Sequence, residues 1–169
     1  MKVLITGASR GLGFELVKKF ASNKNNEIVA VSRNLARLNE LKKICEKEFQ
    51  NFIHIYSIDF LSNNVEHDFV DLFKEHTSHF DIVINNAGFL INQSFSSTSY
   101  SNVLDVYKTN VFAPMLLIKS LIPLLNKEKL CHVVNIGSMG GFQGSAKFSG
   151  LSIYSSSKAA LANLTECLA

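Results

Sequence analysis

The chain has 169 residues, of which 47% are apolar and 18% are charged. This balance allows one domain with a buried core over residues 1–169 and excludes a largely disordered chain. Lysine and arginine exceed the acidic residues by 17 to 14, without the basic runs that bind nucleic acid. Because no apolar stretch is long enough for a membrane span and the N-terminus lacks a signal-peptide pattern, we expect a cytoplasmic protein without nucleic-acid or membrane partners.

The positive charge is unevenly distributed, since residues 1–49 carry ten of the 17 basic side chains. This surplus is either a solvated face or a site for a small anion. The three cysteines, Cys45, Cys131 and Cys167, are far apart and form no C-x-x-C pair. We therefore expect three reduced thiols and predict no metal site.

Short apolar runs alternate with segments whose apolar residues recur at helical spacing. The runs predict strands over 2–6, 27–31, 52–58, 81–85 and 132–136. The spaced segments predict helices over 12–20, 35–45, 65–73 and 103–125, each between two of these strands. Strands that alternate with helices indicate right-handed crossovers and a parallel sheet covered on both faces.

The end of the chain combines a loop with a last helix. Residues 137–150 are rich in glycine and serine and predict a loop. A helix is expected to begin near Ser152 and to run through Leu168, but no glycine, asparagine or basic residue closes its last turn before Ala169. We interpret this ending as an interruption of a longer sequence.

A glycine-rich turn lies between the first predicted strand and the first predicted helix. Thr6–Gly13 reads TGASRGLG, with glycines spaced G-x-x-x-G-x-G. Glycines at this place allow a tight turn, so that the N–H groups of the helix N-terminus can face a phosphate. The same glycines could also serve only close packing of helix and strand.

Two arginines favour a phosphorylated ligand. In a dinucleotide-binding fold, the end of the second strand meets the adenosine ribose, where an acidic residue binds the hydroxyl of NAD and an arginine accommodates the 2′-phosphate of NADP. Here that strand is followed by Arg33 and no acid, and Arg10 lies within the glycine turn. The alternative is that both are solvated surface arginines.

Polar residues follow the fourth and fifth strands and open the last helix. Asn85–Gly88 reads NNAG, which can hold the backbone open beside a ribose or simply end a strand. Tyr154 and Lys158 share one helix face, where the ammonium can stabilise the phenolate and make tyrosine a usable acid/base. Ser138 can donate a hydrogen bond to a carbonyl oxygen, although serine in such a loop is usually a turn residue. Alone, the tyrosine–lysine pair would be an ordinary surface pair.

These motifs together closely resemble the short-chain dehydrogenase/reductase superfamily, in particular its shorter, non-epimerase branch with 3-oxoacyl-carrier-protein reductases and carbonyl reductases. The matching positions follow the family order: Thr6–Gly13, Asp59, Asn85–Gly88, Asn110, Ser138, Tyr154 and Lys158. The resemblance implies a doubly wound, Rossmann-type parallel sheet with strand order 3-2-1-4-5, truncated before a sixth and a seventh strand.

The resemblance also implies roles for four catalytic residues. Tyr154 would pass a proton to or from the substrate oxygen, and Ser138 would orient and polarise that oxygen. Lys158 would hold the nicotinamide ribose and favour the tyrosine anion, while Asn110 would anchor a water that continues the proton relay. The implied substrate is a small ketone, aldehyde or β-keto acyl group. The resemblance also implies a homodimer or homotetramer that assembles through the helices over 103–125 and 152–168.

The implied cofactor is NADP(H) rather than NAD(H). Asp59 and Phe60 would flank adenine, and the segment 86–88 would lie along the cofactor. The full set implied to bind it is Gly7, Ser9, Arg10, Gly11, Leu12, Gly13, Arg33, Asp59, Phe60, Asn86, Ala87, Gly88, Tyr154 and Lys158.

Two departures leave alternatives open. Ser138 and Tyr154 are 16 residues apart, a few more than is usual in the family. Family members also continue for roughly 70 to 90 further residues, so the domain is expected to be C-terminally incomplete. A domain that binds cofactor without turnover, as a sensor or interaction module, is therefore the second hypothesis, and an inactive fragment that exists only by pairing is the third.

Overall fold

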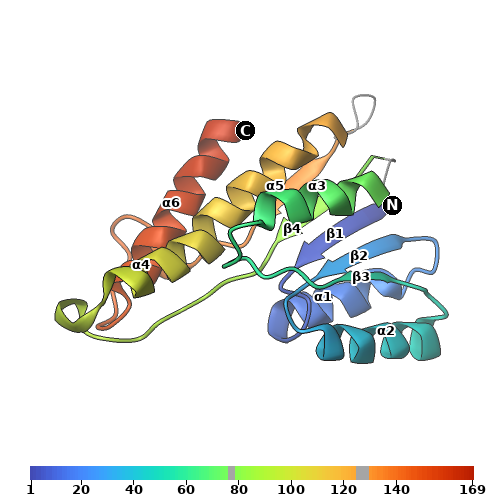
Figure 1. Cartoon of the computed structure of the whole chain (residues 1–169), viewed down its shortest axis with the longest axis horizontal. Helices are drawn as coiled ribbons and strands as arrows, with labels where there is room; N and C mark the ends of the chain where they lie inside the picture. Colours follow the sequence, from blue (N-terminus) through green and yellow to red (C-terminus); the bar gives the residue numbers. More distant parts are fainter. Residues whose placement is uncertain (76–78, 125–129) are drawn as a thin grey trace.

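A computed structural model describes residues 1–75, 79–124 and 130–169. Five strands form one parallel sheet in the order β3-β2-β1-β4-β5 (Figure 1). They are β1 (Lys2–Thr6), β2 (Glu27–Val31), β3 (His54–Tyr56), β4 (Ile82–Asn85) and β5 (His132–Asn135). The predicted Rossmann-type sheet and its strand order are confirmed.

Helices cover both faces of this sheet (Figure 1). One layer consists of α1 (Gly11–Ala21) and α2 (Leu35–Phe49). The other contains α3 (Val65–Glu75), α4 (Tyr100–Tyr107), α5 (Ala113–Leu121) and α6 (Ser152–Leu168). Because both faces are covered, β1 is buried along its whole length, which explains why its sequence is a continuous apolar run after Lys2.

Alternate side chains of the strands build two separate cores. Val3 and Ile5 of β1 join the core under α1 and α2, whereas Leu4 joins the core under α3 and α5. Cys45 of α2 lies fully buried in the first core, where burial and then the carboxylate of Glu48 raise the pKa of the thiol to about 11. Among the described residues, Cys45, Cys131 and Cys167 form no disulfide bond.

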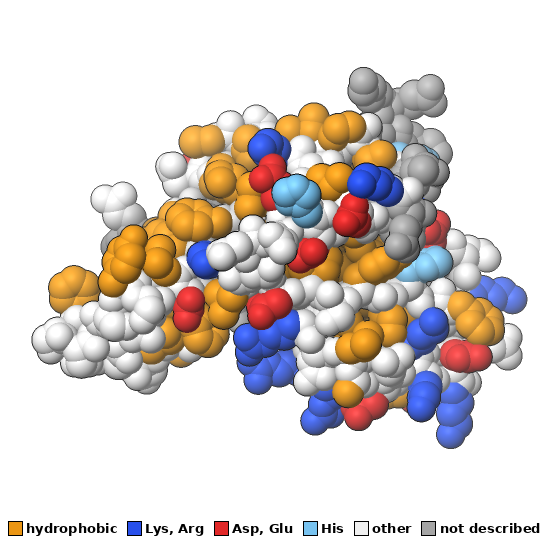
Figure 2. Space-filling model, viewed as in Figure 1, with side chains coloured by type: hydrophobic (Ala, Val, Ile, Leu, Met, Phe, Trp, Pro, Cys, Tyr) orange, Lys and Arg blue, Asp and Glu red, His pale blue; other side chains and the backbone are white. Residues whose placement is uncertain are grey.

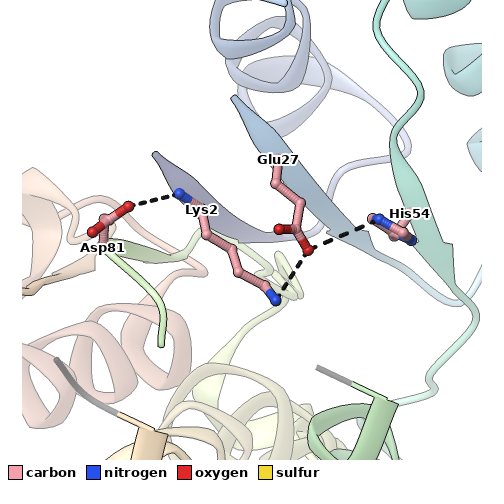
Figure 3. A network of polar contacts seen from close by, with 4 residues as sticks. All are labelled: Lys2, Glu27, His54 and Asp81. Carbon is pink, nitrogen blue, oxygen red and sulfur yellow. Dashed lines mark hydrogen bonds and ion pairs between the residues drawn. The ribbon is translucent and has the colours of Figure 1, made fainter. Parts of the chain in front are cut away.

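The amino ends of the strands are joined by a charged network on the edge away from the carboxyl ends (Figure 3). Lys2 is 7% exposed, and its ammonium lies 3.0 Å from the carboxylate of Glu27 and 5.1 Å from the ring centre of Phe80. His54 lies 3.9 Å from the same carboxylate, and the backbone N–H of Lys2 donates to Asp81 at 2.7 Å. The network ties the starts of β1, β2, β3 and β4 together and stabilises the frame of the sheet.

The long helix predicted over 103–125 is a composite. It begins earlier, at Tyr100, where Ser99 and Asn102 form a capping box. A π-helical segment, Lys108–Phe112, separates α4 from α5, and a 3-10 turn, Ile122–Leu124, follows. The predicted last residue, 125, lies outside the described residues.

Proline explains the π-helical segment. Pro114 lies in the first turn of α5 and has no N–H, so it cannot donate the usual bond to the carbonyl of Asn110 four residues earlier. A local widening of the helix accommodates this loss. Helical periodicity continues through the segment, which is why the sequence pattern did not predict it.

Other boundaries differ by a few residues. The third strand was predicted over 52–58 but is limited to His54–Tyr56, because Phe52 is exposed and lies outside the ladder. The loop over 137–150 contains one 3-10 turn, Met139–Gly141, and α6 begins at Ser152 as predicted. In the described ranges, no helix has both the length and the apolar character that crossing a membrane requires.

Candidate active site

A cleft of about 730 Å³ opens at the carboxyl ends of the strands, where ligands bind in sheets of this kind. We call it the cofactor cleft. Most of the residues predicted to bind a cofactor line it. Its lining is Gly7, Ser9, Arg10, Gly11, Leu12, Ser32, Arg33, Asn34, Arg37, Ile58, Asp59, Phe60, Leu61, Asn86, Ala87, Gly88, Phe89, Leu90, Thr109, Ile136, Gly137, Tyr154 and Lys158.

The glycine turn forms one end of the cofactor cleft. Gly7 and Gly11 have positive φ angles of 67° and 58°, which side chains other than glycine rarely adopt. Gly13 does not line the cleft but allows close packing, because a Cβ there would lie 2.5 Å from the carbonyl oxygen of Gly7. A Cβ on Gly11 would meet nothing within 4 Å, so this glycine faces open space. Close packing is thus one function of these glycines, and the positive φ angles of Gly7 and Gly11 give the tight turn that a phosphate site would need.

The N-terminus of α1 fits an anionic group. Arg10 is its N-cap, no described side chain caps its N–H groups, and its first turn holds no acidic residue. Uncapped N–H groups at a helix N-terminus attract phosphate, and Gly11 and Leu12 bring them to the cleft wall. The residues present therefore fit the pyrophosphate of a dinucleotide.

Basic side chains surround the adjoining part of the cleft. Arg10 and Arg33 both line it, as predicted, and both are exposed. The structure adds Arg37, which sequence reasoning missed; its guanidinium lies 3.2 Å from the carboxylate of Glu40. Figure 2 shows Lys and Arg side chains gathered over the side of the molecule that α1 and α2 form. Part of the basic surplus of residues 1–49 therefore lies at this cleft.

The hydroxyls of Ser9 and Ser32 connect the glycine turn to the end of β2. Ser32 donates to Ser9 at 2.8 Å, and both residues line the cleft. Ser9 was predicted from the motif, whereas Ser32 was missed. The hydroxyl proton of Ser9 remains available for an oxygen in the cleft, because Ser9 accepts in this bond.

Asp59 and Phe60 form the wall after β3. Phe60 packs edge-to-face against Phe69, with ring centres 5.5 Å apart, and is largely buried. The carboxylate of Asp59 accepts a hydrogen bond from the backbone N–H of Leu61 at 3.1 Å. Both predicted residues therefore lie on a wall that the core and the backbone hold in place.

The Asn85–Gly88 segment supports the glycine turn through hydrogen bonds. The backbone N–H groups of Asn86 and Ala87 donate to the hydroxyl of Thr6 at 3.1 and 3.0 Å. The side-chain amide of Asn86 donates to the carbonyls of Thr6 and Gly7 at 3.0 and 3.3 Å. Asn85 turns away from the cleft and donates to Asn135 at 2.8 Å. The two amide side chains thus support the turn and the sheet, while Ala87 and Gly88 line the cleft.

Tyr154 and Lys158 lie together on the cleft wall, one turn apart on α6. Lys158 is 3% exposed, and its ammonium donates to the carbonyl of Ile136 at 2.7 Å. Burial lowers the pKa of Lys158 below that of a solvated lysine. A Cβ on Gly88 would lie 3.8 Å from the same ammonium, so α6 faces the segment after β4.

Asn110 is fully buried in the π-helical segment and does not line the cleft. Its side-chain oxygen accepts from the backbone N–H of Phe89 at 2.8 Å. Its amide donates to the carbonyl of Phe89 and to the hydroxyl of Ser157, both at 2.9 Å. Asn110 therefore joins the segment after β4 to α6, directly beside the residue that follows Gly88.

Ser138, which was predicted to orient the substrate oxygen, lies in a turn beside the cofactor cleft. It caps the 3-10 turn Met139–Gly141, and its hydroxyl accepts from the backbone N–H of Gly140 at 3.3 Å. It is half-buried but does not line the cofactor cleft, although its neighbour Gly137 does. Ser138 is therefore a turn residue, which is one of the two roles considered from the sequence. Its hydroxyl proton is still free to donate to another group.

Several cleft residues had no signal in the sequence. Leu90, Thr109 and Ile136 belong to three segments that come together only in the folded chain. Arg37 follows Arg33 by four residues and lies in the first turn of α2, and a second arginine so soon after a strand end could have indicated it. Among the residues the structure describes, no group of three or more His, Cys, Asp or Glu could hold a metal ion.

Comparison with known proteins agrees with this geometry. The chain matches the short chain dehydrogenase family over residues 1–169. It is 32% identical over 166 residues to the ketoacyl reductase HetN of Nostoc sp., an alignment that covers 98% of this chain and 56% of that protein. It is 28% identical over 169 residues to retinol dehydrogenase 8 of Homo sapiens, covering 99% of this chain and 52% of that protein. The chain thus spans just over half the length of these two relatives.

Solved structures share the fold over nearly the whole chain. A short chain dehydrogenase from Escherichia coli CFT073 complexed with NADPH superposes with a TM-score of 0.90 at 26% identity, covering 99% of this chain and 69% of that one. The bulky-bulky ketone specific alcohol dehydrogenase from Comamonas testosteroni superposes with a TM-score of 0.87 at 28% identity, covering 99% and 65%. The family match, the strand order and a cleft built on the glycine turn lead to one conclusion: the chain belongs to the short-chain dehydrogenases, a family of oxidoreductases that bind a nicotinamide cofactor.

Proposed function

We propose that this protein transfers a hydride between NADP(H) and a carbonyl or secondary alcohol substrate, with Tyr154 as the acid/base. The observation that carries the proposal is the pairing of Tyr154 with a buried Lys158 on the wall of the cofactor cleft. A lysine that burial makes costly to charge is rarely kept without a function. The family relationship and the NADPH complex of one structural relative support it.

The bound nicotinamide would supply or accept the hydride. The chain's own residues would bind, orient and move a proton. In reduction, the phenol of Tyr154 would give its proton to the substrate oxygen, which the hydroxyl of Ser138 would hold by a hydrogen bond. Lys158 would hold the nicotinamide ribose through the N–H groups that its bond to Ile136 leaves free, and its charge would favour the phenolate that remains.

Asn110 would complete the proton path by anchoring a water. Its side-chain oxygen has one lone pair left after the bond from Phe89, and Pro114 leaves its backbone carbonyl without the usual helical donor. A Cβ on Gly88 would lie 3.7 Å from that side-chain oxygen and 3.8 Å from the ammonium of Lys158. The two groups that a relay water would touch thus both border Gly88.

The remaining cleft residues would bind the rest of the cofactor. The glycine turn with Ser9 and Leu12 would hold the pyrophosphate, and Asp59 and Phe60 would border adenine. Arg10, Arg33 and the added Arg37 would surround the 2′-phosphate of NADP(H), which supports this cofactor over NAD(H).

The test of the function is a steady-state assay on a polypeptide that carries residues 1–169. We expect NADPH absorbance to fall on addition of ketone, aldehyde or β-keto acyl substrates, and to stay constant without them. Saturable binding of NADPH without any turnover across this panel would instead support the second candidate, a cofactor-binding module.

We also propose that the protein self-associates through the helices around 103–125 and 152–168. Two apolar residues of the first of these helices, Val106 and Ile118, are buried in the protein's own core and contribute nothing to an outer face. Met115 remains 41% exposed, as does Phe112, whose ring lies 6.4 Å from that of Tyr107.

The outer face nevertheless continues from one helix to the other. The hydroxyl of Tyr107 donates to Ser156 of α6 at 3.1 Å, which places both helices side by side at this surface. Figure 2 shows hydrophobic side chains over this part of the molecule. Light scattering should give a dimer or tetramer at micromolar concentration, and Met115→Glu should shift it toward monomer; a monomer in the wild type, with and without NADPH, would contradict the proposal.

A further inference from the structure

Lys147 makes an unusual set of contacts for an exposed lysine. Its ammonium donates to the carbonyls of Gly140 and Phe142 at 2.7 and 2.5 Å and to the hydroxyl of Ser145 at 2.9 Å. Each of its three N–H groups therefore has an acceptor. An exposed lysine gives up side-chain entropy to hold such a geometry, and single surface contacts rarely compensate for that loss. Three converging acceptors indicate a site built around the ammonium.

Ser145 closes the same loop from within. Its hydroxyl lies 2.6 Å from the carbonyl of Met139 and 2.8 Å from that of Phe142. The carbonyls of Met139, Gly140 and Phe142, which lie in the 3-10 turn or directly after it, are thus satisfied by two side chains that follow the turn. We call residues 139–147 the clamped turn.

The opposite side of the clamped turn rests directly on α6. A Cβ on Gly140 would lie 2.7 Å from the hydroxyl oxygen of Ser155, and a Cβ on Gly141 would lie 2.8 Å from the backbone of Lys158. Glycine is required at position 141, where the near atoms are backbone, whereas a side chain at position 140 would displace the hydroxyl of Ser155. The turn is therefore held between α6, which carries Tyr154 and Lys158, and the ammonium of Lys147.

Gly140 connects this clamp to Ser138. Its N–H donates to the hydroxyl of Ser138 at 3.3 Å, while its carbonyl accepts from Lys147 at 2.7 Å. The N–H of Gly141 donates to the carbonyl of Ser138 at 3.0 Å. Lys147 therefore holds the peptide segment on which the position of the Ser138 hydroxyl depends. The same segment determines the direction in which that hydroxyl can donate its own proton.

We propose that Lys147 is a positioning residue for Ser138: by clamping the turn against α6, it fixes the serine hydroxyl relative to Tyr154. This inference rests on the proposed function, in which Ser138 orients the substrate oxygen. Lys147 itself touches neither cofactor cleft nor reacting atoms among the contacts of the described residues. Without the ammonium, the carbonyls of Gly140 and Phe142 would bond to water instead. The N–H of Gly140, which donates to the hydroxyl of Ser138, would then no longer be held in one position.

The first experiment compares Lys147→Met with the wild type. We expect kcat for carbonyl reduction to fall about tenfold, less than the ~10²-fold expected for Ser138→Ala, because the hydroxyl is misplaced rather than removed. NADPH affinity should be unchanged, since the clamped turn holds no cofactor residue. Lys147→Arg should recover most of the rate because it restores a cation, and Lys43→Met on α2 should have no effect although it removes the same charge.

The decisive control is a double-mutant cycle with Ser138→Ala. If Lys147 acts through the serine hydroxyl, Lys147→Met should cause no further loss of kcat in the Ser138→Ala background. The same fold loss in both backgrounds would overturn the proposal, because it would mean that the clamp serves some other part of the protein.

A second readout does not require activity. Amide hydrogen exchange over residues 139–145 should be roughly tenfold faster in Lys147→Met, because the turn opens more often, while exchange over β1 and β4 stays the same. Unchanged exchange over 139–145 would overturn the clamp even in an active enzyme. A protein that reduces no carbonyl but shows the faster exchange would refute the proposed function and leave the clamp of the turn established.

Discussion

Tyr154→Phe should lower carbonyl reduction by at least ~10²-fold while NADPH affinity changes little, because the substitution removes the ionisable hydroxyl and keeps the ring. Tyr154 lies in the first turn of α6 on the wall of the cofactor cleft, where the ring also forms part of the surface that a cofactor would meet. The loss should therefore appear in kcat, with the dissociation constant of NADPH from calorimetry as the internal control. Retention of more than about a tenth of wild-type turnover would mean that Ser138 or a bound water supplies the proton.

Lys158→Ala is the companion variant and should lower both kcat and the affinity for NADPH. The lysine is assigned both the ribose contact and the stabilisation of the phenolate, so NADPH affinity and kcat should fall together. Lys158→Ala also removes a buried ammonium that donates to Ile136, so thermal unfolding of the variant must be compared first. A variant with normal unfolding and normal NADPH affinity would contradict the ribose contact.

The pH profile provides a check with a defined sign. Reduction requires a phenol that still carries its proton, so the rate should fall as the pH rises. Burial lowers the pKa of Lys158, so its charge is lost at a lower pH than that of a solvated lysine, and its support of ribose and phenolate is lost in the same direction. Tyr154→Phe should keep the part of the alkaline loss that comes from the charge of Lys158, and a profile of unchanged shape in this variant would mean that the hydroxyl of Tyr154 adds nothing to it.

NADPH should bind at least tenfold more tightly than NADH. Arg10, Arg33 and Arg37 all line the cleft, and charge-assisted contacts to a 2′-phosphate exceed the ~1.4 kcal/mol that a factor of ten requires. Arg33→Ala should weaken NADPH binding about tenfold and leave NADH binding nearly unchanged, because only NADPH carries the phosphate. Calorimetry with both cofactors measures the two affinities directly.

The third arginine sharpens this test. The guanidinium of Arg37 forms an ion pair with the carboxylate of Glu40 at 3.2 Å, which offsets part of its charge. Arg37→Ala should therefore weaken NADPH binding less than Arg33→Ala does. Lys47→Ala, in the last turn of the same helix, removes an equal charge outside the cleft lining and is the matched control. Equal affinity of the wild type for NADPH and NADH would refute the assignment of all three arginines to a phosphate.

Local patterns in the amino-acid sequence predict the fold class and a large part of the cleft. Continuous apolar runs predict strands buried on both faces, and helical spacing between them predicts crossovers, so the order of elements could be derived from local patterns alone. Resemblance to the family placed Asp59, Tyr154 and Lys158 in the cleft, whereas the glycine turn with Arg10 and Arg33 could be placed there for a related physical reason. Residues that follow the carboxyl ends of parallel strands meet at the same edge of the sheet whatever their separation in the chain.

The use of individual side chains at that edge follows from the packing of the folded chain and could not be predicted from local patterns. Asn86 supports the glycine turn, Asn110 joins Phe89 to Ser157, and Lys147 holds the turn that carries Ser138. The π-helical segment beside Pro114 likewise has no counterpart in the apolar pattern. A hydrogen bond depends on where two distant segments meet to within an ångström, whereas periodicity records only which face of an element is buried; the first is therefore a property of the packed chain, and the second of the sequence.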